Sequence, residues 1–310
     1  MPPLLPRVFA LRAVAGSRLY STAIETVPLS FARHDPPTSG KPTSPPLVIL
    51  HGLFGSKQNN RSISKSVSSS LACFLYYQAF AKDLNTSVFA LDLRNHGESP
   101  HIERHDYEAM SADVEKFLEQ HALENTIIMG HSMGAKVAMT LSLRRSDLIS
   151  KLISVDNAPT DAILHSSFGH YIRAMQRIEA SQVKKQSEAD LILQEVEKNI
   201  GVRQFLLTNL TKPPGEEFLK FRVPVGILKK ALDRVGGFPF HPDEVRCTKP
   251  ALFVRGTKSH YVPDEVIPLI GRFFPNFTIK DIDAGHWVMS EKPTEFKTTV
   301  LEWLAKENED

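Results

Sequence analysis

Gly130-His131-Ser132-Met133-Gly134 is the stretch that decides the fold of this chain. It has the pattern G-x-S-x-G and stands between the apolar run 126–129, which predicts a buried strand, and the helix-compatible residues 135–141. A serine at such a strand-to-helix turn has its hydroxyl lifted clear of the backbone, and glycines permit the turn because they lack a Cβ. The start of the helix adds free N–H groups and a positive dipole end. The stretch therefore predicts a nucleophile, Ser132.

A second glycine-containing loop follows an earlier strand. The apolar run Leu47-Val48-Ile49-Leu50 leads directly into His51-Gly52-Leu53-Phe54-Gly55. Taken alone, this loop predicts only a tight turn. Together with Ser132 it indicates an oxyanion hole, because glycines let backbone N–H groups approach a substrate oxygen. We predict that the donors are the N–H of Leu53 and the N–H of Met133.

Apolar runs along the chain predict strands that alternate with helices. They occur at 47–50, 88–91, 126–129, 152–155, 251–254 and 277–282, and residues 27–33 predict an edge strand. This alternation predicts an α/β fold with a mostly parallel central sheet flanked by helices. Residues 160–249 show helical patterns, which predict either a cap over Ser132 or helices that simply cover the sheet. We place the core at 23–159 and 250–306 and the helical cap at 160–249.

A histidine follows the last predicted strand, in Asp283-Ala284-Gly285-His286-Trp287. Open α/β sheets place functional residues at the carboxyl ends of their strands. Since Ser132 and His286 both follow predicted strands, we expect them at the same edge of the sheet. His286 is then the predicted general base for the serine proton.

Five motifs in order carry a family resemblance: HGLFGSK, DLRNHGESPH, GHSMGAK, VDNAP and DAGHW. Between about Pro46 and Leu304 the chain resembles the α/β-hydrolase superfamily. The motifs together are similar to a subgroup that contains small bacterial acyl esterases, mitochondrial α/β-hydrolase-domain proteins and fungal ethanol acetyltransferases. The resemblance implies an α/β-hydrolase fold with its helical cap inserted after the sixth strand.

Three aspartates are candidates for the acid of a Ser-His-Asp triad. In many superfamily members the acid follows the strand after the cap in a G-x-x-D pattern, but the third residue after Gly256 is Ser259. A hydroxyl cannot stabilise an imidazolium as a carboxylate does. Asp156 ends the strand after the helix of the nucleophile, and the resemblance also places the acid in VDNAP. We predict Asp156, with Asp264 and Asp283 as lesser candidates.

These residues predict a serine hydrolase that cleaves short or medium acyl esters or thioesters through an acyl-enzyme. One alternative is an alcohol O-acetyltransferase that makes ethyl acetate from acetyl-CoA and ethanol, since an alcohol can replace water at the acyl-enzyme. A second alternative is a catalytically silent binding protein, because a fold does not fix a function. The chemistry needs no metal or redox cofactor, and acetyl-CoA would be a substrate.

The run Asp92-Leu93-Arg94-Asn95-His96-Gly97-Glu98-Ser99-Pro100 also gathers acidic and imidazole side chains. Such a cluster is compatible with catalysis or metal binding. We favour a structural loop whose side chains form hydrogen bonds with buried backbone. Asp113, in the helical pattern 107–121, is expected to order a neighbouring loop.

Composition narrows the class of protein. The 310 residues carry a formal net charge of +2, too small to indicate a nucleic-acid partner. The two cysteines, Cys73 and Cys247, do not form a CxxC pattern, so a disulfide framework is not expected and a reducing compartment fits. No apolar run approaches the roughly 18 residues of a transmembrane span.

The N-terminal segment 1–22 differs from the rest. It contains Arg7, Arg12 and Arg18, no acidic residue, and apolar residues that can share a helical face. This composition is typical of a mitochondrial transit peptide, and a disordered basic tail is the alternative. The predicted location is mitochondrial.

Residues 66–78 interrupt an otherwise regular pattern. Joined directly, 62–65 and 79–84 would make an amphipathic helix, whereas the intervening residues combine a serine run with an apolar block lacking helical periodicity. The resemblance implies that relatives in the subgroup lack this segment. We interpret it as a retained intron, with a genuine loop insertion as the alternative. In a genuine loop, exposed Phe74, Leu75, Tyr76 and Tyr77 would be available to a membrane or an acyl chain.

Overall fold

The structure is a computed structural model that describes residues 24–37, 41–58, 69–161 and 166–306. The predicted transit peptide at 1–22 lies outside these ranges, as do residues 66–68 of the suspected insertion. Among the described residues no helix is long and apolar enough to cross a membrane.

Seven strands of the described chain form one sheet in the order β1-β3-β2-β4-β5-β8-β9. They are β1 (Phe31–His34), β2 (Leu47–Leu50), β3 (Val88–Leu91), β4 (Thr126–His131), β5 (Ile149–Val155), β8 (Ala251–Gly256) and β9 (Phe277–Ile282). Only the pairing of β1 with β3 is antiparallel. The residues of β2 and β3 are all buried, as expected for parallel strands covered on both faces. The predicted mostly parallel sheet is confirmed.

The order of the strands creates a switch point beside β4. From β2 the chain moves outward to β3 and then returns to β4, on the other side of β2. In open parallel sheets a crevice forms at such a point, outside the carboxyl ends of the strands. The loops after β2 and β4 therefore diverge here, with Leu50 paired with Gly130 at the strand ends.

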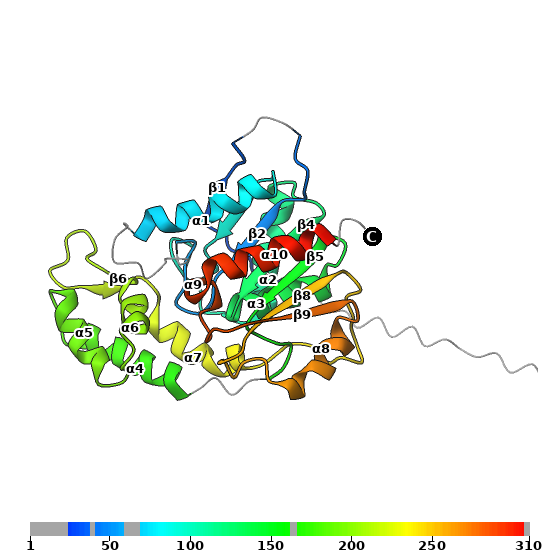
Figure 1. Ribbon diagram of the computed structural model, residues 1–310. Helices are drawn as coiled ribbons and strands as arrows, with labels where there is room; N and C mark the ends of the chain where they lie inside the picture. Colours follow the sequence, from blue (N-terminus) through cyan, green and yellow to red (C-terminus); the bar gives the residue numbers. More distant parts are fainter. Residues whose placement is uncertain (1–23, 38–40, 59–68, 162–165, 307–310) are drawn as a thin grey trace, which may run out of the picture.

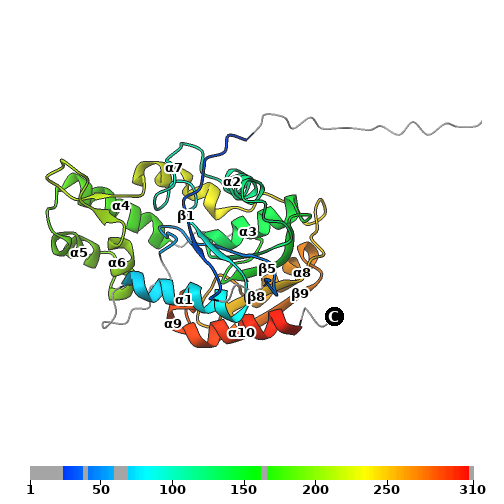
Figure 2. The same cartoon turned by 90° about the horizontal axis from the view of Figure 1, so that it is seen from above.

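Helices cover both faces of the sheet, and each face has its own hydrophobic core (Figure 2). One face packs against α2 (Tyr107–Gln120), α3 (Met133–Arg144) and α8 (Ile267–Phe273). The other packs against α1 (Ser69–Asp83), α9 (Val288–Glu291) and α10 (Pro293–Lys306). The sheet is therefore enclosed on both faces, so ligands have access to it mainly at the strand ends.

A mainly helical insertion lies between β5 and β8. It contains α4 (Ser166–Ala180), α5 (Gln186–Gln194), α6 (Ile200–Leu207) and α7 (Val225–Gly236), with a small hairpin of β6 (Leu210–Thr211) and β7 (Lys220–Phe221). In Figure 1 the group α4 to α6 lies to one side of the sheet instead of along its face, as a cap does. The insertion follows the fifth described strand and not the sixth, because a single edge strand precedes β2 in the described chain.

The suspected insertion is partly helical, which corrects the expectation of an irregular block. Helix α1 begins at Ser69 and continues to Asp83, so residues 69–78 supply most of it. Tyr77 is 4% exposed and its ring lies 5.3 Å from that of His34, so Tyr77 is not the exposed side chain expected. Tyr77 lies on the side of α1 that packs against the sheet, and this packing explains its burial. The intron hypothesis remains a prediction, which sequencing of the transcript would test.

Candidate active site

Ser132 stands at a strained turn between β4 and α3. Its φ is 54° and its ψ is −116°, a backbone conformation that side chains rarely adopt. A Cβ at Gly130 would lie 2.1 Å from the carbonyl oxygen of Gly134, and one at Gly134 would lie 2.5 Å from that of Leu50. The two glycines are thus required by close backbone contact, and the predicted strand–turn–helix arrangement of the serine is present.

The structure brings Ser132, His286 and Asp156 together from the ends of β4, β9 and β5. His286 Nε2 lies 2.9 Å from Ser132 Oγ, and His286 Nδ1 lies 2.7 Å from Asp156 Oδ2. With the proton on Nδ1, the imidazole donates to the carboxylate and accepts from the serine hydroxyl. That tautomer can remove the serine proton.

Asp156 is fully buried and its carboxylate is held on both oxygens. Oδ1 accepts from the N–H of Gly256 at 3.0 Å, and Oδ2 accepts from the hydroxyl of Ser259 at 2.5 Å. The lesser candidates are elsewhere: the Asp264 and Asp283 side chains are 79% and 67% exposed and form ion pairs with other residues. Of the three aspartates, Asp156 is the one in contact with His286.

The two predicted oxyanion donors flank the serine. Leu53 and Ser132 line one cavity, and Met133 joins both in the wall of a second. Neither N–H donates a hydrogen bond within the described part of the chain. His51 holds the loop that follows β2. Its Nδ1 donates to the carbonyl of Gly52 at 2.8 Å, and its Nε2 accepts from a backbone N–H in the loop after β3 at 3.0 Å. The sequence signal for this bracing role was only the position of His51 beside a glycine.

Two further aromatic rings hold His286, and sequence reasoning missed both. His131 Nε2 donates to the carbonyl oxygen of His286 at 2.8 Å, and the two rings are 4.9 Å apart. Burial, assisted by the nearby His286, lowers the pKa of His131 to about 4, so His131 is neutral near pH 7. The ring of Tyr261 stacks on His286 at 4.1 Å and 25°. Burial raises the pKa of Tyr261 to about 12, so it is a neutral phenol.

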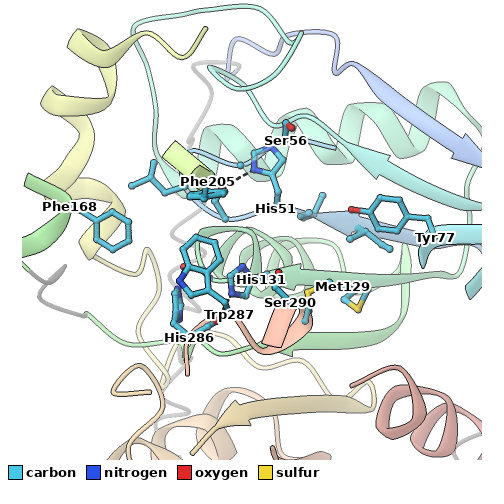
Figure 3. A pocket seen from close by; sticks show the side chains of 17 residues that line it. His51, Ser56, Tyr77, Met129, His131, Phe168, Phe205, His286, Trp287 and Ser290 are labelled. Atoms are coloured by element: carbon cyan, nitrogen blue, oxygen red, sulfur yellow. Dashed lines mark hydrogen bonds between the residues drawn. The ribbon is translucent and has the colours of Figure 1, made fainter. Parts of the chain in front are cut away.

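An aromatic cavity of about 170 Å³ lies beside His286. It is formed by core and cap together, and its aromatic lining residues are Phe54, Phe168, Tyr171, Phe205, Tyr261 and Trp287. Figure 3 shows Phe168 and Phe205 of the cap facing Trp287 and His286 of the core, in the neighbouring cavity that Ser132 lines. The aromatic cavity has no lysine, arginine or carboxylate among the described residues that line it. It therefore suits an apolar group of a substrate better than a charged one.

Comparison with known proteins identifies the family of this chain. Residues 45–188 match the family described as the alpha/beta hydrolase fold. The chain is 42% identical to the "Probable alcohol acetyltransferase" of Saccharomyces cerevisiae, over 86% of this chain and 79% of the relative. This chain belongs to the α/β-hydrolase family. It is also 37% identical to the "sn-1-specific diacylglycerol lipase ABHD11" of Mus musculus, over 91% of this chain and 87% of that one. A solved "Marine microorganism esterase" superposes with a TM-score of 0.78 at 30% identity, over 89% of this chain and 99% of the esterase.

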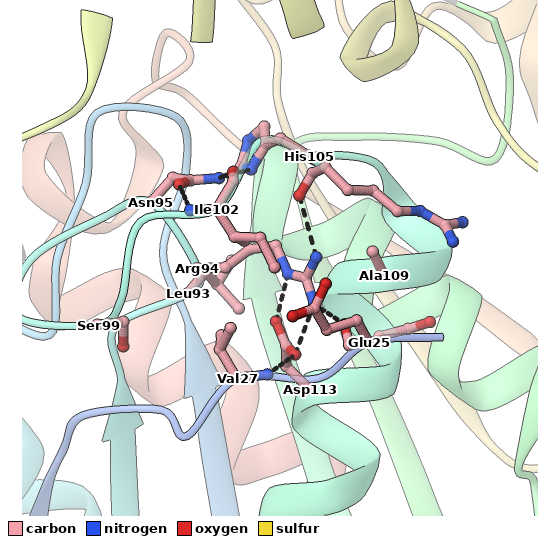
Figure 4. A network of polar contacts seen from close by, with 12 residues as sticks. Glu25, Val27, Leu93, Arg94, Asn95, Ser99, Ile102, His105, Ala109 and Asp113 are labelled. Atoms are coloured by element: carbon pink, nitrogen blue, oxygen red, sulfur yellow. Dashed lines mark hydrogen bonds and ion pairs between the residues drawn. The ribbon is translucent and has the colours of Figure 1, made fainter. Parts of the chain in front are cut away.

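The polar loop of this α/β-hydrolase has the structural role predicted for it. Arg94 and Asp113 form a fully buried ion pair through two hydrogen bonds, and Asp113 also accepts from the N–H of Val27 (Figure 4). Asn95 binds the backbone of Ile102 through both ends of its amide. The side chains of this cluster thus bind one another and the backbone. In the described part of the hydrolase no group of three His, Cys, Asp or Glu residues is arranged to hold a metal ion.

Proposed function

We propose that this α/β-hydrolase is a serine hydrolase that cleaves short or medium acyl esters or thioesters through an acyl-enzyme. The observation that carries the proposal is the pair of contacts at His286, to Ser132 Oγ on one ring nitrogen and to Asp156 on the other. The aromatic cavity beside the same imidazole provides space for an apolar group of the substrate. The lipase and esterase names of two relatives support the same reaction class.

In the first half-reaction Ser132 Oγ attacks the carbonyl carbon and its proton passes to His286 Nε2. The carbonyl oxygen becomes an oxyanion, which the N–H groups of Leu53 and Met133 stabilise, each by about 3 kcal/mol in comparable sites. Asp156 accepts the Nδ1 hydrogen bond and balances the imidazolium charge. Collapse breaks the bond to the alcohol or thiol, which takes the proton from His286. Water, deprotonated by the same imidazole, then attacks the acyl-enzyme and releases the acid.

Labelling with a fluorophosphonate probe tests this proposal and separates it from the catalytically silent alternative. The wild-type protein should be labelled stoichiometrically and should hydrolyse p-nitrophenyl acetate. Ser132→Ala should be neither labelled nor active while its circular dichroism is unchanged. A folded wild-type protein that resists the probe and turns over no ester would leave the silent binding protein as the better proposal.

A second candidate is alcohol O-acetyltransferase, which the name of the 42% identical relative favours. Hydrolysis and transfer share one acyl-enzyme and differ in whether water or an alcohol reaches it. Incubation with acetyl-CoA and ethanol, followed by measurement of ethyl acetate against free acetate, distinguishes them. A product dominated by acetate supports the hydrolase, and one dominated by ethyl acetate supports the transferase.

We also propose that residues 1–22 direct the protein to mitochondria. The support is compositional: the segment carries three arginines and no acid. A fluorescent fusion of the full chain should colocalise with a mitochondrial marker, and one that begins at residue 23 should not. Equal distribution of both fusions would contradict the proposal.

A further inference from the structure

The end of α7, the last helix of the cap, is fastened to two helices of the core. The hydroxyl of Tyr107, in α2, donates to the carbonyl of Val235 at 2.7 Å. The ammonium of Lys136, in α3, donates to the carbonyls of Gly236 at 2.9 Å and Gly237 at 3.0 Å. Carbonyls at the C-terminal end of a helix have no N–H partner within that helix. Tyr107 and Lys136 therefore supply donors that α7 lacks, and we call these two side chains the α7 clamp.

Lys136 carries a positive charge although it is buried. It is 1% exposed, and its ammonium lies 5.6 Å from the centre of the Tyr107 ring. Burial lowers the pKa of Lys136 to about 8, which leaves the amine mostly protonated at pH 7. A positive charge is favourable at this place, because the C-terminal end of a helix carries a partial negative charge. The α7 clamp thus joins cap and core by charge as well as by hydrogen bonds.

The α7 clamp also forms part of the wall of a small cavity beside the nucleophile. Ser132 and the predicted oxyanion residues Leu53 and Met133 line this cavity, together with both clamp side chains and Val235. Its volume is about 10 Å³, which is room for about one water molecule. His286 is not among the described residues that line it, whereas His286 does line the aromatic cavity of about 170 Å³.

This difference in lining separates the two halves of an ester. In the proposed reaction the leaving alcohol or thiol takes its proton from His286, so it belongs in the aromatic cavity. The acyl group stays on Ser132 Oγ beside the oxyanion donors, so it belongs in the small cavity. The third cavity is lined by both Ser132 and His286 and lies where the reacting bond would be. A space of this size beside the serine fits an acetyl methyl group better than a longer chain.

We infer that Lys136 and Tyr107 determine the acyl-length specificity of this enzyme: by fastening the end of α7 they keep the acyl cavity small, so that acetyl-sized groups are preferred. This inference rests on the proposed serine-hydrolase function and narrows its substrate class to esters or thioesters of very short acids. While the carbonyls at residues 235–237 are held, Val235 cannot move away from the cavity to make room for a longer chain. Loss of the clamp should therefore admit longer acyl groups.

The experiment measures kcat/KM for p-nitrophenyl acetate, butyrate and hexanoate, per site titrated with a fluorophosphonate. In the wild-type protein kcat/KM should fall steeply from acetate to hexanoate. The ratio of hexanoate to acetate should rise about tenfold in Lys136→Met, which loses a charged donor, and about threefold in Tyr107→Phe, which loses a neutral one. Lys230→Met is the matched control, because that lysine is 73% exposed on the same helix and pairs with Glu103 at 3.3 Å. Its ratio should equal that of wild type.

A second series separates a change in the acyl cavity from a general loosening of the cap. Phenyl acetate and 1-naphthyl acetate share the acyl group and differ in the size of the leaving alcohol. Their kcat/KM ratio should stay within about twofold of wild type in both clamp variants, because neither clamp side chain lines the aromatic cavity. If Lys136→Met does not fold, as judged by circular dichroism, Tyr107→Phe still decides, since it keeps the ring and removes only the hydroxyl.

Three outcomes would overturn the inference. They are equal kcat/KM for acetate and hexanoate in the wild type, an unchanged ratio in the folded clamp variants, or an equal shift in the acyl and leaving-group series. Failure of the wild-type protein to react with the fluorophosphonate would instead reject the proposed function, so the two failures are distinguishable.

Discussion

The cluster around His286 and the cluster around His96 both place histidine near an ionisable side chain, and they differ in where their hydrogen bonds go. In the first, both ring nitrogens of His286 contact side chains, one of which is the hydroxyl of Ser132 on a cavity wall. In the second, His51, His96 and His105 lie with rings 5.0 and 5.6 Å apart near the Arg94–Asp113 pair. The residue types are nearly the same in both.

The second cluster is committed to holding backbone. His96 Nε2 accepts from the N–H of Phe54, and its Nδ1 donates to the carbonyl of Arg94, just as His51 joins two loops. Burial lowers the pKa of all three histidines, which keeps them neutral. Histidine and acid close together therefore do not identify a catalytic site. A serine hydroxyl on a strained turn, in the wall of a cavity, separates the first cluster from the second.

The largest expected effect follows from replacing Ser132. This change removes the hydroxyl of the first cluster and leaves the second cluster intact. Ser132→Ala should lower kcat for p-nitrophenyl acetate by about 10⁶-fold, as in other triads, and leave the free energy of unfolding within about 1 kcal/mol. Ser142→Ala is the control: Ser142 lies in α3, the helix that follows Ser132, its hydroxyl donates to the carbonyl of Ala138, and the variant should keep its activity. Substantial ester turnover by Ser132→Ala would place the nucleophile elsewhere.

Replacement of the acid comes next. Asp156→Asn should lower kcat by about 10⁴-fold, because an amide cannot balance the imidazolium and favours the wrong imidazole tautomer. Asp264→Asn and Asp283→Asn should be near wild type, since both carboxylates are exposed and paired away from His286. Near-normal turnover by Asp156→Asn, measured by initial rates on titrated enzyme, would assign the acid to another residue.

Removal of Asp113, the buried acid near the second cluster, should lower stability and leave kcat unchanged, which is the opposite of the result expected for Asp156→Asn. Asp113→Ala leaves the Arg94 guanidinium buried without its carboxylate, so we expect a loss of about 3–5 kcal/mol in the free energy of unfolding. The kcat per titrated site should be unchanged in the molecules that fold. Glu103→Ala removes an ion pair whose two side chains are both 73% exposed, and urea denaturation should detect almost no change. A fall in kcat without a fall in stability would mean that the second cluster takes part in the chemistry.

The sequence predicted Ser132, Asp156 and His286 of the first cluster, but it did not predict the other side chains that contact His286. The difference has a physical reason. Ser132 and His286 occupy loops after strands, and their roles require specific residue types, so the local pattern carries the signal. The hydrogen bond from His131 to His286 joins residues more than 100 positions apart, and the stacking of Tyr261 on His286 joins two separate loops, so neither contact has a local signature. Residues 69–78 belong to α1 although their apolar positions lack helical periodicity, and Tyr77 is buried in the core beside the sheet, which a local pattern does not reveal.

Acid should destabilise both clusters, because each contains a buried neutral histidine. These are His131, which contacts His286 in the first cluster, and His105 in the second. Burial lowers the pKa of His105 from the ordinary value of about 6.5 to about 4, and it lowers the pKa of His131 to about 4 as well. Between pH 4 and pH 6.5 these histidines are protonated in the unfolded chain but not in the folded one. Their contribution to the free energy of unfolding is therefore fully present above about pH 6.5 and is lost as the pH falls toward 4. A shift of this size corresponds to roughly 3 kcal/mol for each histidine.

The measurement is the urea midpoint between pH 7.5 and pH 4.5, for wild type and for His105→Asn. The variant should be less stable than wild type at pH 7.5. Its stability should fall less steeply on acidification, because it lacks the imidazole that becomes protonated only in the unfolded chain. His241→Asn is the control, since that imidazole is exposed, and its curve should run parallel to wild type. Parallel curves for His105→Asn and wild type would show that the imidazole of the second cluster does not titrate on unfolding. The contrast between a neutral structural histidine and the proton transfer proposed for His286 would then need another physical basis.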